Sequence, residues 1–197
     1  KLLRSAEAKK LYKINKNDIT LTASPLDHSL GQRLLLLPLL SGGTSVVLST
    51  FTTFNFYETV KKNKITFAIL VSTQIHELKK NKNEFSKLYL KKGLVSASAK
   101  LNNNLKEELI KKNIKVFEMY GASEIGTVTS IVLNKVKNKY KSVGKPCSKA
   151  KIKILSNENT FLPINGIGEI VCSTPLKFKK YFGMEKETAD SFYKGYF

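Results

Sequence analysis

The chain has 197 residues, of which 42% are hydrophobic and 25% charged, values that are ordinary for a globular protein large enough to bury a substantial core. It is strongly basic, with 34 lysines and arginines against 15 acidic residues and a net charge of +19. The lysines are spread along the chain, however, and only Arg4 and Arg33 supply the guanidinium groups that nucleic-acid sites use for bidentate contacts, so specific nucleic-acid binding is disfavoured.

Up to about residue 130, short apolar runs alternate with amphipathic runs. In chain order, the pattern predicts a helix over 1–14, a strand over 18–23, a helix over 30–40, a strand over 44–48, a helix over 54–63, a strand over 65–71, a helix over 73–80, a strand over 93–96, a helix over 105–113 and a strand over 115–119. This alternation indicates βαβ units and a parallel sheet that helices cover on both faces. Binding sites in such sheets lie beyond the carboxyl ends of the strands.

From about residue 131 the pattern changes, since the β-type runs 131–133, 151–155 and 168–172 are separated by turn-rich stretches, and no helix is predicted between them. The predicted fold class is therefore α/β. A parallel-sheet βαβ subdomain over 1–130 is followed by an incomplete, antiparallel, β-barrel-like subdomain over 131–197.

No apolar run approaches the ~20 residues that a transmembrane helix needs. The first residues also lack the charged-then-apolar pattern of an export signal. Cys147 and Cys172 lie far apart without a nearby histidine, which predicts two reduced thiols and a cytoplasmic protein. The chain starts at Lys1 without a methionine, which suggests that it was cut from a longer one.

The segment Tyr120 to Glu124, with the sequence YGASE, follows the predicted strand over 115–119. Tyr120 offers an aromatic face for a purine, and Gly121 allows close backbone approach to a ligand. Ser123 can hydrogen-bond a phosphate oxygen, and Glu124 is an oxygen ligand of the kind that Mg²⁺ takes. The residues alone also allow an ordinary turn in which Ser123 caps a following helix.

YGASE resembles the Tyr-Gly-x-(Ser/Thr)-Glu signature of the adenylate-forming superfamily, which includes acyl-CoA synthetases, luciferases and the adenylation domains of peptide synthetases. Other segments resemble motifs of this family in its order and approximate spacing. They are SPLDHSLG over 24–31, LSGGTSVVL over 40–48, VSASAKL over 95–101, SVGKP over 142–146, GEIV over 168–171 and GYF over 195–197. The resemblance covers nearly the whole chain and implies the flavodoxin-like half of the family's large N-terminal domain.

The resemblance implies that Tyr120 and Gly121 lie against the adenine of ATP or AMP and that Ser123 contacts the α-phosphate. It also implies that Glu124 holds Mg²⁺, so that Ser123 and Glu124 take part in catalysis. The segment from Ser96 to Ala99 would form the opposite wall, with Ser98 and Ala99 beside the nucleotide and Ser96 beside the acid. In this segment Ala97 and Ser98 replace the family's paired glycines.

Two further residues match the family's substrate segment. His28 corresponds to a histidine that lines or gates the acyl pocket, although it could instead cap the following helix. Asp27 is placed where amino-acid-activating members carry an aspartate for the substrate ammonium, although it could also be an exposed loop residue. His76 is predicted to be structural or on the surface.

The implied reaction joins a small carboxylic acid to AMP and then to a thiol, either CoA or the phosphopantetheine of a carrier protein. An acyl- or aryl-acid:CoA ligase and an amino-acid-activating domain that feeds a carrier protein both remain open. A non-catalytic basic module that binds nucleic acid is the third reading. The family's phosphate loop, the Asp of its TGD motif and its small C-terminal domain are not in this sequence, so we expect the 197 residues alone to be inactive.

Overall fold

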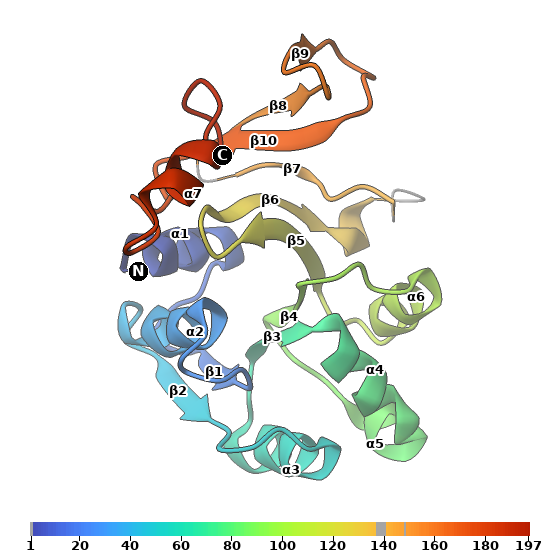
Figure 1. The fold of residues 1–197 in the computed structure, drawn as a ribbon. Helices are drawn as coiled ribbons and strands as arrows, with labels where there is room; N and C mark the ends of the chain where they lie inside the picture. The colour runs from blue at the N-terminus through green and yellow to red at the C-terminus, as the bar shows by residue number, and fades with distance from the viewer. Residues whose placement is uncertain (1, 137–140, 148) are drawn as a thin grey trace.

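The computed structural model describes residues 2–136, 141–147 and 149–197, and its strands form a seven-stranded sheet and a separate three-stranded sheet (Figure 1). The strands of the large sheet, in spatial order, are β2 (Thr44–Val47), β1 (Ile19–Thr22), β3 (Phe67–Val71), β4 (Gly93–Ala97), β5 (Val116–Ala122), β6 (Gly126–Val132) and β7 (Lys145–Pro146). The first five strands pair in parallel, whereas β6 and β7 are antiparallel to their neighbours. The large sheet therefore extends beyond residue 130, which lies inside β6.

Helices cover both faces of the parallel part of this sheet. The helices are α1 (Leu2–Tyr12), α2 (Ser29–Leu39), α3 (Thr53–Asn63), α4 (Ser72–Lys80), α5 (Lys82–Lys87) and α6 (Asn103–Lys111). One hydrophobic cluster packs α1 and α2 against one face, through residues such as Tyr12, Leu34 and Phe67. The other packs α3 to α6 against the opposite face, through residues such as Phe56, Leu70 and Leu105. The sequence prediction of an α/β fold with a covered parallel sheet is confirmed.

Local sequence explains where several of these elements begin and end. Thr52 starts α3 by accepting a hydrogen bond from the Asn55 backbone amide at 3.0 Å, and Lys64 ends it in the left-handed conformation at φ 51°. Asn102 caps α6 in the same manner, through the Asn104 amide. The predicted strand over 65–71 is shortened to β3, whose first four residues are fully buried in the middle of the sheet.

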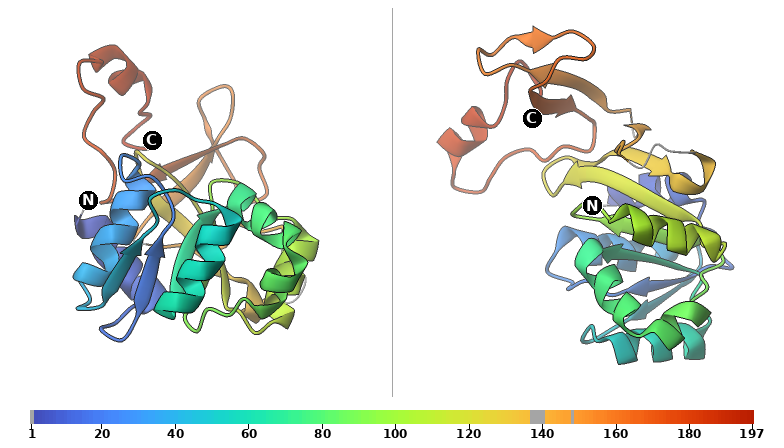
Figure 2. Two further views of the ribbon diagram at one scale, coloured as in Figure 1. Left: turned by 90° about the horizontal axis from the view of Figure 1, so that it is seen from below. Right: turned by 90° about the vertical axis from the view of Figure 1, so that its right-hand side faces the viewer.

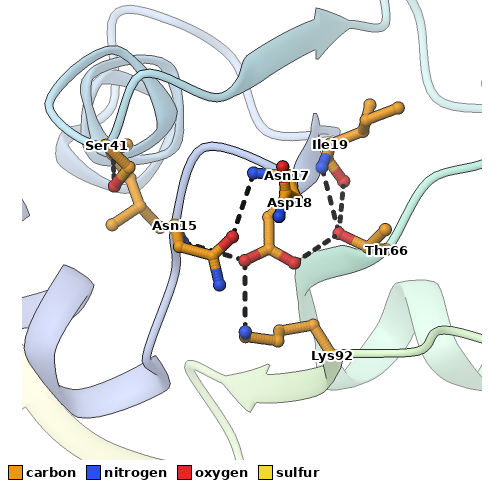
Figure 3. A network of polar contacts seen from close by, with 8 residues as sticks. Asn15, Asn17, Asp18, Ile19, Ser41, Thr66 and Lys92 are labelled. Atoms are coloured by element: carbon orange, nitrogen blue, oxygen red, sulfur yellow. Dashed lines mark hydrogen bonds and ion pairs between the residues drawn. The ribbon is translucent and has the colours of Figure 1, made fainter.

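A polar network fixes the edge of the sheet opposite the carboxyl ends of the strands (Figure 3). Asp18, which is 5% exposed, receives a hydrogen bond from the Thr66 hydroxyl at 3.1 Å and one from the Asn15 amide at 2.9 Å. The Lys92 ammonium lies 3.2 Å from Oδ2 of Asp18, the oxygen that also accepts the Asn15 amide. These contacts tie the segments before β1, β3 and β4 together, so we interpret the network as structural.

The small sheet contains β8 (Lys151–Leu155), β9 (Phe161–Leu162) and β10 (Glu169–Ser173), in the order β10-β8-β9 with antiparallel pairing. Figure 2 shows it beyond the β6–β7 side of the large sheet. Ile125 of the β5–β6 turn and Val128 of β6 join Cys172 of the small sheet in a third hydrophobic cluster, against which Tyr120 and Phe197 pack. The two sheets therefore share a core at the β5–β6 hairpin.

The structure corrects three details of the sequence prediction. The run 131–133 is the end of β6 and the start of the 3-10 helix Leu133–Lys135, because β6 already begins at Gly126. Two short helices were not predicted, α5 and α7 (Glu185–Asp190), the second of which follows the last predicted β-type run, 168–172. Both helices have six residues, α5 buries only Phe85 and α7 buries none, so neither leaves an amphipathic pattern in the sequence. Within the described residues, no helix is long and apolar enough to cross a membrane.

Candidate functional site

The carboxyl ends of four parallel strands meet around one cavity, which we call the His28 cavity. Its volume is about 460 Å³. The strand ends contribute the residues after β1 (24–25), Val71 of β3, Ala97 of β4 with Ser98 after it, and Gly121 and Ala122 of β5 with Ser123 after them. Helix α2 contributes Ser29, Leu30 and Arg33. As the sequence pattern predicted, the polar motifs lie beyond the carboxyl ends of the strands, and together they line one cavity.

The SPLDHSLG segment forms the turn from β1 into α2. Gly31 is required there, because a Cβ atom at this position would lie 2.1 Å from the Pro25 carbonyl oxygen. His28 stands at the N-cap of α2, but its side chain makes no capping hydrogen bond, and it lines the cavity. Asp27 is exposed and is not among the residues that line the His28 cavity. His76 is exposed on α4, away from this wall.

Gln74 of α4 is a cavity residue that the sequence analysis did not single out. Its side-chain oxygen accepts a hydrogen bond from the Val71 amide at 3.1 Å, and its amide nitrogen donates to the Ala23 carbonyl at 3.0 Å. The side chain thus joins the carboxyl ends of β3 and β1 beneath the cavity.

A smaller cavity of about 110 Å³ lies on the other side of Ser98, and we call it the Tyr120 cavity. Ser96, Ser98 and Ala99 form one wall, and Glu118 to Tyr120 of β5 form another, together with 141–143. Ser98 has a left-handed backbone at φ 71°, which glycine adopts readily. Ser98 therefore adopts a backbone conformation that favours glycine, although its residue type is different. The Ser96 hydroxyl is buried and has no hydrogen-bond partner within the described part of the chain.

Tyr120 itself is half-buried between the Tyr120 cavity and the third hydrophobic cluster. Burial raises the pKa of its hydroxyl, and the nearby Cys172 and Glu169 raise it further. The ring is therefore neutral in the physiological range and can offer its face to a flat ligand.

A buried ion pair holds Glu118, one of the residues that line the Tyr120 cavity. The Lys106 ammonium of α6, which is 0% exposed, lies 2.7 Å from Oε2 of Glu118, which is 8% exposed. The other Glu118 oxygen accepts the Leu101 amide at 3.1 Å. Glu118 thereby connects β5 to α6 and to the loop that carries Ser98 and Ala99.

The YGASE segment forms a β-hairpin between β5 and β6, not a loop that leads into a helix. Its pairing shifts register between Tyr120 and Gly121, and a Cβ atom on Gly121 would lie 2.0 Å from the Gly126 carbonyl oxygen. The alternative in which Ser123 caps a helix is therefore wrong. Ser123 is exposed at the tip, and its hydroxyl lies 3.3 Å from the hydroxyl of Ser29.

Glu124 is held at the hairpin tip by the segment after β10. Tyr181 donates a hydrogen bond to its carboxylate at 3.1 Å, and the Phe178 amide donates to its carbonyl at 2.6 Å. Tyr181 has a raised pKa, because of burial and its contact with Glu124, so it remains a donor at neutral pH. The Tyr181 contact was not predicted.

Both arginines of the chain lie at this site. Arg4 donates hydrogen bonds to the carbonyl oxygens of Ser123, Glu124 and Leu176 and so fixes the hairpin tip. Arg33 lies between the His28 cavity and a cavity of about 350 Å³ that Arg4 also lines, the Arg4 cavity. Burial lowers the pKa of both guanidinium groups. Their rarity in a lysine-rich sequence was the signal that could have identified them.

The donor set fits Mg²⁺ only together with a phosphate ligand. Glu124 is a single carboxylate, and the described residues contain no group of three or more His, Cys, Asp or Glu side chains able to hold a metal. Mg²⁺ at nucleotide sites takes one or two carboxylates together with substrate phosphates and water. Glu124 therefore suits a metal that arrives with a nucleotide.

Comparison with known proteins places the geometry in context. The profile of the family described as AMP-binding enzyme matches residues 2–182. The chain is 29% identical over 176 residues to a 2-succinylbenzoate–CoA ligase of Oceanobacillus iheyensis, a match that covers 86% of this chain and 35% of that protein. It is 27% identical over 179 residues to the 4-coumarate–CoA ligase-like 6 protein of Arabidopsis thaliana, covering 87% of this chain and 32% of that protein.

A solved structure shows the same fold. The o-succinylbenzoate CoA synthetase of Bacillus subtilis, in complex with ATP and a magnesium ion, superimposes with a TM-score of 0.87 at 23% identity. The match covers 99% of this chain and 41% of that protein. The chain thus spans about a third of the length of these two curated relatives, at 35% and 32%.

Proposed function

The chain belongs to the family of AMP-binding enzymes, and from that premise we propose that the complete protein activates a carboxylic acid with ATP and passes the acyl group to a thiol. The observation that supports this most is the meeting of two cavities at Ser98. One has the aromatic Tyr120 beside it, and the other is bordered by Ser123 and His28. A nucleotide in the first and an acid in the second would face each other at the hairpin tip.

We assign the residues as follows. Tyr120, Ser98 and Ala99 hold the adenosine in the Tyr120 cavity, whereas His28 borders the acid in the His28 cavity. Because Ser96 lines the Tyr120 cavity and Gly121 lines the His28 cavity, we assign Ser96 to the nucleotide and Gly121 to the acid, the reverse of the sequence expectation. Ser123 hydrogen-bonds the α-phosphate, and Glu124, oriented by Tyr181, faces the metal. When bound, Mg²⁺ neutralises phosphate charge.

The chemistry follows from this placement. A carboxylate oxygen of the acid attacks the α-phosphorus of ATP, a new P–O bond forms, and the bond to the β,γ-phosphates breaks to release pyrophosphate. A thiol then attacks the acyl carbon of the acyl-adenylate, and AMP leaves. Because both reactants of the first step are anions, cationic groups and hydrogen-bond donors near Ser123 lower its barrier.

We favour an acid:CoA ligase over an amino-acid-activating domain, because Asp27 does not line the His28 cavity. CoA is the proposed acceptor. The alternative acceptor is the phosphopantetheine of a carrier protein, which would then be a protein partner of this enzyme. We further propose a cytoplasmic location, where ATP and CoA are available. Residues 1–197 alone are proposed to be inactive.

The test is acid-dependent ATP–pyrophosphate exchange by the complete protein, with panels of fatty, aromatic and amino acids. We expect exchange with a fatty or aromatic acid and a loss of about 10²-fold or more in Glu124→Gln, since a metal-facing charge is removed. Glu158→Gln, an exposed residue of the turn between β8 and β9, is the matched control. An unaffected rate in Glu124→Gln would contradict the metal role. Exchange by residues 1–197 alone would contradict the expected inactivity.

A further inference from the structure

Arg33 is a buried cation that has no carboxylate partner among the described residues. It is 7% exposed, and one of its Nη atoms donates to the Thr127 hydroxyl at 3.0 Å. Its Nε atom has no hydrogen-bond partner within residues 2–136, 141–147 and 149–197, and no ion pair joins Arg33 to an acid there. Arginine cannot relieve burial by losing its proton. A buried charge left uncompensated is costly, so this guanidinium is suited to bind an anion.

The position of Arg33 in the cavity indicates where such an anion would bind. Arg33 follows Ser29 by one turn of α2, and one turn of a helix rises about 5.4 Å. The Ser29 hydroxyl lies 3.3 Å from that of Ser123, which is exposed at the cavity mouth, whereas Arg33 is buried. Arg33 therefore lines the His28 cavity about one helical turn deeper than the pair of serines.

The wall of the His28 cavity as a whole has more apolar than polar surface. Pro25, Leu30, Val71, Ala97 and Met119 contribute to it. A ligand that reaches from Ser123 to Arg33 thus needs an apolar middle portion and an anionic end.

We propose that Arg33 selects acids that carry a second carboxylate, so that the substrate class is a dicarboxylic acid with a short apolar spacer. This inference rests on the proposed function. One carboxylate reacts near Ser123, and the other accepts hydrogen bonds from the Arg33 guanidinium. Arg4 is less suited to this role, because all three of its nitrogen atoms already donate to the backbone carbonyls of Ser123, Glu124 and Leu176.

The experiment measures ATP–pyrophosphate exchange by the complete protein with acids matched in length, adipate against hexanoate and glutarate against valerate. We expect a higher kcat/KM for the dicarboxylic acid of at least one pair. Arg33→Met should lower kcat/KM for that acid by about 10- to 100-fold, the effect of losing a hydrogen bond to a charged group. It should lower kcat/KM for the matched monocarboxylic acid by a clearly smaller factor, so that the preference for the dicarboxylic acid is lost. The control is Lys111→Met, which removes an exposed charge on α6.

Arg33→Lys is the control for a loss of activity through misfolding, because it keeps the charge and loses only the forked geometry of the guanidinium. This variant should retain part of the preference for the dicarboxylic acid and most of the rate. An equal loss with both acids in Arg33→Met, a raised KM for ATP alone, or exchange with monocarboxylic acids only would overturn the proposal while leaving the proposed function intact. No exchange with any acid would overturn both.

Discussion

The Lys106–Glu118 pair allows a quantitative prediction about the support of the Tyr120 cavity. Lys106→Met keeps the length of the side chain but removes the ammonium that lies 2.7 Å from Glu118. Glu118 would then be a carboxylate at 8% exposure, with the Leu101 amide as a remaining donor. Removing one partner of a buried pair costs about 3–5 kcal/mol of unfolding free energy, because the other charge stays buried without compensation.

The assay is urea denaturation of the chain, followed by circular dichroism. Lys79→Met is the matched control, because Lys79 pairs with Glu108 on the surface, where each side chain is 41% exposed. An exposed pair contributes about 0–1 kcal/mol. The double variant Lys106→Met with Glu118→Gln should recover part of the loss, since no uncompensated charge remains. If Lys106→Met cost no more than Lys79→Met, the reasoning would be refuted.

Three further predictions concern other parts of the structure. Asp18→Asn should lower the free energy of unfolding by about 2–4 kcal/mol, measured in urea, because it weakens the Lys92 ion pair and two hydrogen bonds; an unchanged midpoint would contradict the structural role. Gly121→Ala should disrupt the β5–β6 hairpin, seen as faster amide exchange in β6, whereas a native exchange pattern would show that the hairpin accommodates a Cβ atom. Burial raises the pKa of the Cys172 thiol, so its alkylation by iodoacetamide, followed by peptide mass spectrometry to separate it from that of Cys147, should begin at higher pH than that of free cysteine and become rapid only in urea; rapid modification of Cys172 in the folded chain at pH 8 would argue against burial.

Much of the fold could be predicted because the large sheet follows the apolar pattern of the sequence closely. The run 65–71 is apolar except for Thr66, and its residues 67–71 form the buried strand β3. The short helix α7 could not be predicted, since it buries no side chain and therefore imposes no periodicity. The β5–β6 hairpin was missed because the turn depends on the close approach of Gly121 to Gly126, which no local pattern reveals.

Some residues of the candidate site could be predicted from the sequence, and others could not. Ser98, Tyr120 and Ser123 belong to contiguous motifs and could be named from the sequence. Arg33 stands out in the sequence only by the rarity of arginine, and its place at the cavity depends on the fold, which brings α2 to Thr127, its hydrogen-bond partner 94 residues later. Tyr181 likewise meets Glu124 across 57 residues. Contacts of this kind arise from tertiary packing, which residue patterns alone do not specify.

The central claim is that the two cavities that meet at Ser98 form one adenylation site. The most direct test is a crystal structure of the complete protein with AMP. We predict that adenine lies in the Tyr120 cavity against the tyrosine ring and that the phosphate points to Ser123. Adenine bound elsewhere, for example in the cavity of about 530 Å³ that Tyr57 and Leu88 line, would contradict the account.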